Sequence, residues 1–184
     1  MVREDFSTII RKIRIISGSI LFAYVIMHLL NHSINIFSID LADAVRSSYF
    51  HPVWQNPVGL VLLYGSFVAH MILGFSSILT RKSFKMKAKD WIQIIFPVLA
   101  LLFLLQHIAA SFAITKIFGG EETYSLLFAV MNTDPPSEII IGAILFSLMT
   151  IFIWVHGVIG LDSYYQNSTF TVVYKMLLLF KPID

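Results

Sequence analysis

The sequence predicts an all-α fold of the polytopic transmembrane bundle class. Of the 184 residues, 57% are apolar, and four apolar segments are each long enough to cross a bilayer, which takes roughly 20 helical residues. Each of these segments also carries histidine. No stretch is typical of a soluble domain, so we expect one membrane domain over residues 1–184. The chain has no cysteine, which excludes disulfides, iron–sulfur ligation and thiolate chemistry.

The first predicted helix covers residues 13–37 and follows a short basic N-terminus. Its apolar run is too long for a signal peptide and no small-residue cleavage site follows, so we expect the helix to be retained. The next stretch is too polar to span a membrane. Over residues 40–50 we expect a short helix that lies in the membrane interface, with Asp40 as its N-cap.

Three more spanning helices are predicted, at residues 58–80, 91–118 and 138–165. A basic run at residues 81–89 separates the first two of them. The apolar tail, residues 169–184, has about half the length that a span needs. We therefore expect a partial fifth helix there, in preference to an interfacial segment.

The placement of basic residues predicts the orientation. They collect before the first helix and in the 81–89 run, whereas the other two connecting loops hold only Arg46 and Lys116. By the positive-inside rule, the N-terminus and the 81–89 run face the cytoplasm, and the other two loops face outward.

One histidine in each spanning segment is the main functional signal: His28, His70, His107 and His156. His28 and His107 each lie about ten residues before the predicted outer end of their helices, and His70 and His156 a similar count before the inner end, which is roughly 15 Å in each case. This predicts an outer pair and an inner pair. Two facing imidazoles on opposite helices are the axial ligands that a b-type haem needs.

Other readings of these histidines stay open. A histidine inside a membrane is often a hydrogen-bonding partner for a neighbouring helix. His28 and His32 are four residues apart, which also suits zinc, although the spans contain no internal carboxylate. His32 is the alternative to His28 as iron ligand, and it could instead bind a haem propionate or a quinone head group.

Residues near the two predicted membrane surfaces are candidates for binding haem propionates, by charge and position. For any single one of them, membership of an ordinary belt of aromatic and basic residues is the preferred interpretation. On the outer side they are Arg46, Trp54 and Lys116, and on the inner side Lys89, Trp91 and Tyr164.

Four short motifs carry a resemblance to known proteins: MHLLNH at residues 27–32, LLYGSFVAH at 62–70, QH at 106–107 and WVHGVIG at 154–160. In order and spacing they resemble the N-terminal membrane anchor of a group of bacterial class III adenylate cyclases. That anchor is similar to the di-haem cytochrome b subunit of succinate dehydrogenase and fumarate reductase. The resemblance covers nearly the whole chain.

The resemblance implies a di-haem cytochrome b-like bundle in the bacterial cytoplasmic membrane, with two haem b groups and quinone as a further ligand. It implies a homodimer that regulates an attached cytoplasmic adenylate cyclase, because class III catalytic sites form between two chains. No cyclase catalytic domain lies within the 184 residues, so no enzyme activity is assigned to this chain.

Two other functions remain as alternatives. The chain could be an electron-carrying anchor subunit of succinate dehydrogenase or fumarate reductase, with flavoprotein and iron–sulfur partner subunits and quinone as redox partner. It could also be a haem-free dimerising membrane tether. We expect no nucleic-acid partner under any of these.

Overall fold

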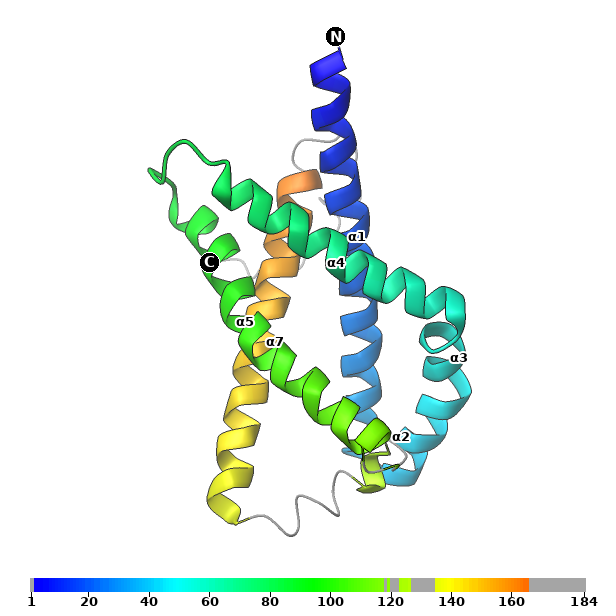
Figure 1. Cartoon of the computed structure of the whole chain (residues 1–184). Helices are drawn as coiled ribbons and strands as arrows, with labels where there is room; N and C mark the ends of the chain where they lie inside the picture. The colour runs from blue at the N-terminus through cyan, green and yellow to red at the C-terminus, as the bar shows by residue number, and fades with distance from the viewer. Residues whose placement is uncertain (1, 118, 120–122, 127–134, 166–184) are drawn as a thin grey trace, which may run out of the picture.

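The computed structural model describes residues 2–117, 119, 123–126 and 135–165 (Figure 1). These residues are helical apart from short connections, and none of them lies in a strand. The elements in chain order are α1 (Val2–Ile34), α2 (Ile39–Val45), the π-helical turn η1 (Arg46–Phe50), α3 (His51–Trp54), α4 (Pro57–Leu79), α5 (Ala88–Phe112), the π-helical turn η2 (Ala113–Ile117) and α7 (Pro136–Tyr165).

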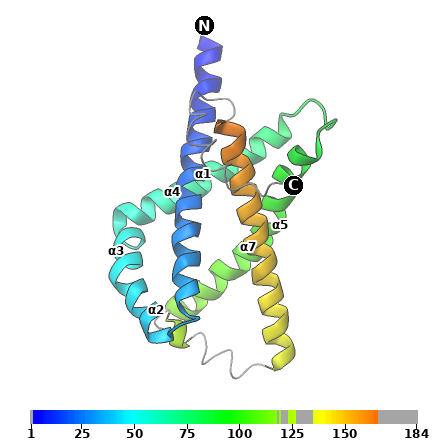
Figure 2. The same ribbon diagram turned by 180° about the vertical axis from the view of Figure 1, so that it is seen from behind.

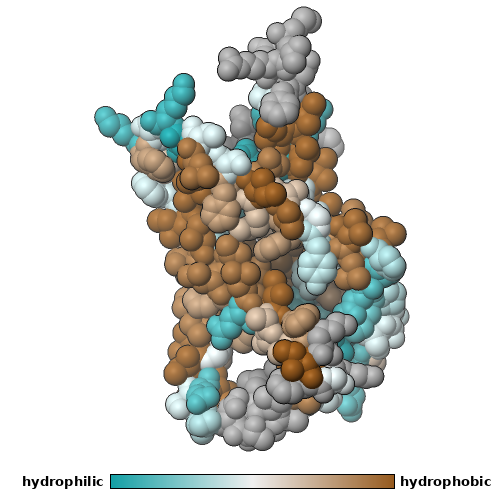
Figure 3. Space-filling view, viewed as in Figure 1, coloured by the Kyte–Doolittle hydropathy of each residue, from teal (hydrophilic) through white to brown (hydrophobic). Residues whose placement is uncertain are grey.

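Four of these helices are long and apolar enough to cross a membrane: α1 from Ser7, α4, α5 and α7. Nearly all of their side chains remain accessible rather than packed in a protein core, and apolar residues cover the helices on the face shown in Figure 3. In a soluble protein such a surface would aggregate, whereas lipid tails would cover it in a bilayer. The predicted all-α fold with four candidate membrane spans is therefore confirmed.

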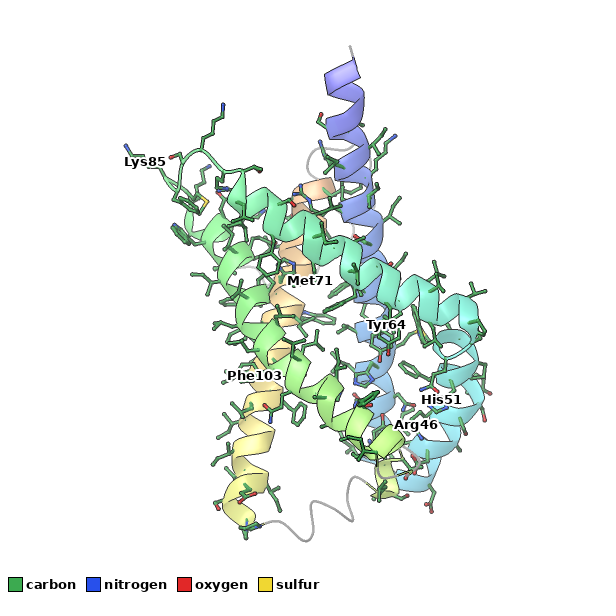
Figure 4. All side chains as sticks on the ribbon, viewed as in Figure 1. Arg46, His51, Tyr64, Met71, Lys85 and Phe103 are labelled. Atoms are coloured by element: carbon green, nitrogen blue, oxygen red, sulfur yellow. The ribbon has the colours of Figure 1, made fainter. Side chains whose placement is uncertain are left out.

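The bundle consists of two helix pairs. Helix α1 packs mainly against α4, and α5 packs mainly against α7, while a smaller contact joins α1 to α7. Figures 1 and 2 show the N-terminus at one end of the bundle and α2 at the other. We call these ends the N-side and the α2-side. Lys85 extends from the connection on the N-side, and Arg46 lies on the α2-side (Figure 4).

Two helix starts on the α2-side are set by side-chain caps. Ser38, not the predicted Asp40, caps α2, because its Oγ accepts from the Leu41 amide at 3.2 Å. Asp40 lies in the first turn, where its negative charge suits the helix dipole. Asn56 caps α4 by accepting from the amides of Val58 and Gly59 at 2.9 and 3.0 Å. This cap turns the chain sharply back into the bundle.

Several predicted helix bounds need correction. The predicted 13–37 helix begins at Val2 and ends at Ile34, since residues 2–12 contain no glycine or proline to stop it. The predicted 91–118 helix begins at Ala88, and after Phe112 it continues as a π-helical turn.

The other bounds are closer to the prediction. The predicted 40–50 helix runs on through η1 and α3, because the proline after His51 sits in a first turn, where its missing N–H needs no partner. The predicted 58–80 and 138–165 helices are Pro57–Leu79 and Pro136–Tyr165. The predicted tail, residues 169–184, lies outside the described residues.

Candidate functional site

Four of the five histidines in the candidate spans form two pairs that cross the bundle. On the N-side, His70 of α4 faces His156 of α7, with 6.1 Å between the ring centroids. On the α2-side, His28 of α1 faces His107 of α5, with 6.0 Å between the ring centroids. Each pair joins one helix of the α1–α4 half to one helix of the α5–α7 half. The pairing predicted from depth is therefore present in the structure.

The two pairs lie at different levels of the bundle. The His70 ring packs against Gly18 of α1, and His28 lies ten residues further along the same helix. At 1.5 Å per residue this separates the levels by about 15 Å along α1. An aromatic contact between Phe22 of α1 and Trp154 of α7, with ring centroids 5.3 Å apart, lies between the levels.

The His70 ring is fixed by groups on α1. Its Nδ1 lies 3.1 Å from the Arg14 carbonyl oxygen and 3.3 Å from Ser17 Oγ. A carbonyl oxygen only accepts, so Nδ1 carries the proton, and Nε2 keeps the lone pair that a metal ion requires. A Cβ at Gly18 would lie 2.9 Å from His70 Cε1, so only glycine leaves room for the ring at this position.

His156 is held through its backbone and offers a ring nitrogen. Its carbonyl oxygen accepts from Gln93 Nε2 at 2.8 Å, which ties α5 to α7 at this level. Its Nδ1 is buried and has no hydrogen-bond partner among the described residues. A buried ring nitrogen without a partner is unusual in a folded protein and calls for a ligand.

The His28 ring sits in a cage of aromatic side chains. It lies nearly parallel to Tyr24, with centroids 5.6 Å apart, and 5.9 Å from Phe50 of η1. On the opposite side of the pair, the His107 ring lies 5.6 Å from Phe146 of α7. These contacts restrict the rotamers of both histidines and orient the pair.

His32 adds a third imidazole on the α2-side. Its Nε2 lies 3.0 Å from His28 Nε2, and the two ring centroids are 4.4 Å apart. A ligand at His28 Nε2 therefore has to displace this hydrogen bond, whereas His70 Nε2 has no such competitor in the contacts described above.

The spacing of the cross-bundle pairs fits a metal centre between two imidazoles. Two metal–nitrogen bonds of about 2 Å and two ring radii of about 1.1 Å place the centroids about 6 Å apart. His28 and His107, and His70 and His156, have this spacing, whereas the directly hydrogen-bonded His28 and His32 are closer.

A zinc centre built from several protein ligands has less support. Within the described residues, no group of three or more His, Cys, Asp or Glu side chains could hold a metal ion. A structural zinc site needs four such ligands and a catalytic site needs three. The paired histidines instead suit a cofactor that supplies the remaining ligands itself, as a porphyrin does.

Two of the predicted propionate-binding residues lie on the α2-side. Trp54 is buried, donates from Nε1 to Met27 Sδ at 3.3 Å, and packs edge-on against Tyr24. Arg46 lies 3.9 Å from Asp43 Oδ1, and its buried Nε has no hydrogen-bond partner among the described residues. That N–H is available to an anionic ligand group.

The remaining predicted residues contact other groups on the N-side. Lys89 forms an ion pair with Asp162 at 2.6 Å. Trp91 stacks on Phe84 with centroids 6.2 Å apart, and the Arg11 guanidinium lies 5.9 Å above the Tyr164 ring. The side chain of Lys116 lies outside the described part of the chain.

The structure adds a network that the sequence analysis missed. Asp43 of α2 accepts from the Tyr124 amide at 2.8 Å, and from the amide and Oγ of Ser125 at 3.3 and 2.9 Å. The Tyr124 hydroxyl accepts from Asn31 Nδ2 at 2.8 Å, and its ring lies 5.0 Å from His32. Asp43 and Tyr124 are 81 residues apart in sequence, so no local pattern indicates their contact.

This network determines the pKa of the Asp43 carboxyl. Its partial burial acts to raise its pKa, but the hydrogen bonds from Tyr124 and Ser125, together with the nearby Arg46, outweigh burial and lower the pKa below its usual value. The carboxylate therefore stays ionised and accepts all three hydrogen bonds at neutral pH.

Comparisons of the chain with models of protein families, with curated proteins and with solved structures gave no match. The case for a function therefore rests on the two cross-bundle histidine pairs and their surroundings.

Proposed function

We propose that this chain is a membrane domain that binds two b-type haems, one between His70 and His156 and one between His28 and His107, with His32 as the alternative to His28. One observation carries the proposal. Both pairs cross the bundle with ring centroids 6.0 and 6.1 Å apart, a separation at which the two imidazoles of each pair could hold one haem iron.

The chain's own residues would hold and orient these groups. The Arg14 carbonyl and Gly18 fix the His70 ring, and the hydrogen bond at Nδ1 leaves Nε2 as the nitrogen with a lone pair for a ligand. Arg46 would bind a propionate on the α2-side, because its buried Nε–H has no hydrogen-bond partner among the described residues, whereas the predicted Trp54 already donates its N–H to Met27 Sδ. Bound haem would supply reversible one-electron chemistry, and the histidines that hold it and the burial around them would tune its potential.

A quinone is the second ligand that we propose, on the α2-side. The side-chain oxygens of Asn31 and Asn35 are buried without a hydrogen-bond partner in the described part of the chain. Amide oxygens of this kind accept from the hydroxyls of a quinol. The head group would then lie next to His32, at the membrane interface.

The redox or quinone-bound state would serve to regulate an attached adenylate cyclase in a dimer, as the resemblance to cyclase anchors suggests. Basic residues on the N-side favour a cytoplasmic N-terminus in a bacterial inner membrane. Helix α7 carries His156 and ends on the same side, where Lys89 and Arg11 contact it. A change at the N-side pair would therefore reach the end of α7 over a short distance.

Electron transfer to or from quinone as an anchor subunit is the second candidate function. The observation that favours it is the stacking of the two pairs about 15 Å apart along α1, which would carry electrons across the membrane. Co-purification decides between the two roles. Flavoprotein and iron–sulfur partner subunits support electron transfer, whereas a cyclase domain joined in frame supports regulation.

A reduced-minus-oxidised absorption spectrum of the detergent-purified chain tests haem binding. We expect the α-band of a low-spin b-type cytochrome when the chain is produced with ample haem precursor. The matched control is a variant with His28, His70, His107 and His156 replaced by alanine, which should be colourless. A colourless wild-type chain would leave a haem-free membrane tether as the remaining function.

A further inference from the structure

Two histidines on one face of α1 compete for the same position opposite His107. His28 and His32 are four residues apart and share a hydrogen bond between their Nε2 atoms at 3.0 Å. Each could serve as a ligand by chemistry alone. Only one of the two imidazoles can pair with His107 of α5. The surroundings of the two rings therefore have to determine which one it is.

The two rings differ in what surrounds them. The His28 ring lies between Tyr24 and Phe50 and 6.0 Å from His107. The His32 ring instead lies edge-on to Tyr124, with centroids 5.0 Å apart. Besides His28, Tyr124 is therefore the side chain whose ring restricts His32, and it stays in place when His28 is removed.

Tyr124 is itself held firmly. It is 6% exposed, and Asn31, which donates to its hydroxyl at 2.8 Å, is 4% exposed. The backbone of Tyr124 and Ser125 is fastened to α2 by Asp43. A tyrosine held at both ends is restricted in its movement, because its backbone cannot shift without losing the hydrogen bond to Asp43, and its hydroxyl cannot shift without losing the buried one from Asn31.

We propose that Tyr124, fastened by Asp43 and Asn31, is a positioning residue that keeps His32 out of line with His107, so that His28 is the imidazole opposite His107. This inference rests on the proposed haem function. Removal of the Tyr124 ring frees His32 to turn toward α5, and His32 then replaces His28 when His28 is absent.

The test counts haem per chain in full-length protein by the pyridine haemochrome method. The wild type and His32→Ala should carry two haems, and His28→Ala should carry one. The double variant His28→Ala/Tyr124→Ala should return to two, because His32 then reaches the vacant position. The N-side haem serves as an internal folding control, since a misfolded variant would lose it as well.

Two further variants distinguish the role of the Tyr124 ring from the role of the Asp43 hydrogen bonds that hold its backbone. His28→Ala/Tyr124→Phe loses the hydrogen bond from Asn31 but keeps the ring and the Asp43 contacts that hold its backbone, so it should remain near one haem. His28→Ala/Asp43→Ala releases the backbone of the 123–126 segment, so it should move toward two. This pair of variants also gives a result if the Tyr124→Ala double variant does not fold.

The outcomes are distinct. Two haems in His28→Ala alone would show that His32 needs no release, and one haem in both double variants that release Tyr124 would show that Tyr124 is not the barrier. Either result overturns the inference while the haem proposal stands. A wild type without haem would overturn the proposed function and this inference with it.

Discussion

The two ends of the bundle position their histidines in different ways. On the N-side, His70 and His156 are placed by the packing of long helices, through the Arg14 carbonyl, Gly18 and Gln93. On the α2-side, the rings depend on a short connecting segment, residues 123–126, that Asp43 fastens over them. Substitutions in the helix faces should therefore affect the N-side pair, and substitutions in the connections should affect the α2-side pair.

The largest expected effect on haem content comes from removing a histidine of one pair only. His107→Ala should reduce the haem content from two per chain to one and leave the N-side haem in place, because the two pairs share no residue. Absorption and low-temperature EPR spectra of the variant should then show a single low-spin centre. His51→Ala on α3 is the matched control and should keep both haems. Loss of both haems from His107→Ala would contradict two independent pairs.

A second substitution should lower haem occupancy at the N-side pair alone. Gly18→Ala places a Cβ 2.9 Å from His70 Cε1, and the ring cannot retreat without losing its contact with the Arg14 carbonyl. Overpacking of this kind destabilises by about 1–3 kcal/mol, so we expect lower N-side haem occupancy and an unchanged α2-side haem. Gly142→Ala, where a Cβ meets nothing within 4 Å, controls for the higher helix propensity of alanine. Equal haem loss in both variants would count against the Gly18 contact.

A third prediction concerns the pH dependence of the α2-side. The folded pKa of Asp43 is lowered, so its contribution to stability is fully present above the unfolded value of about 3.9 and is lost as pH falls through the folded value. The apparent Tm of the wild type should therefore exceed that of Asp43→Asn by a constant amount between pH 5 and 8. The difference should shrink below pH 4. A difference that grows in acid would mean that the carboxylate destabilises the folded state.

The smallest effect is expected at the N-side ion pair. Lys89 and Asp162 lie 2.6 Å apart, but the lysine side chain is 42% exposed, so solvent screens the interaction. Exposed pairs contribute about 0.2–1 kcal/mol, and a double-mutant cycle of Lys89→Met and Asp162→Asn should give a coupling energy in that range. The α2-side haem spectrum should stay unchanged in all three variants. A shift of that spectrum would show that the two ends are coupled.

Much of the fold could be predicted from the sequence. Unbroken apolar segments of sufficient length have few structural options in a membrane, so the four spans follow from composition. The ends of the helices are harder to predict. Residues 2–12 include several charged residues, yet they contain no glycine or proline that would stop a helix. Ser38 and Asp40 are both good N-caps, and the local backbone rather than residue type decides between them.

The histidine pairing could also be predicted, because the helical rise is fixed and residue counts convert directly into depth. The contact of Tyr124 with His32 could not be predicted. In the sequence, two spanning helices, α4 and α5, separate Asp43 from Tyr124. Neither residue stands out by its type or spacing. The contact of Gly18 with His70 is of the same kind, since only the packing of α1 on α4 creates it.

The most direct test of the central claim is the haem-to-chain ratio in His70→Ala, His156→Ala and the corresponding double variant. If these two imidazoles hold one haem together, each single variant and the double variant should all carry one haem, and it should be the same one by its EPR signal. If the two single variants lose different haems, or the double variant carries none, then His70 and His156 do not share a haem and the proposed arrangement is wrong.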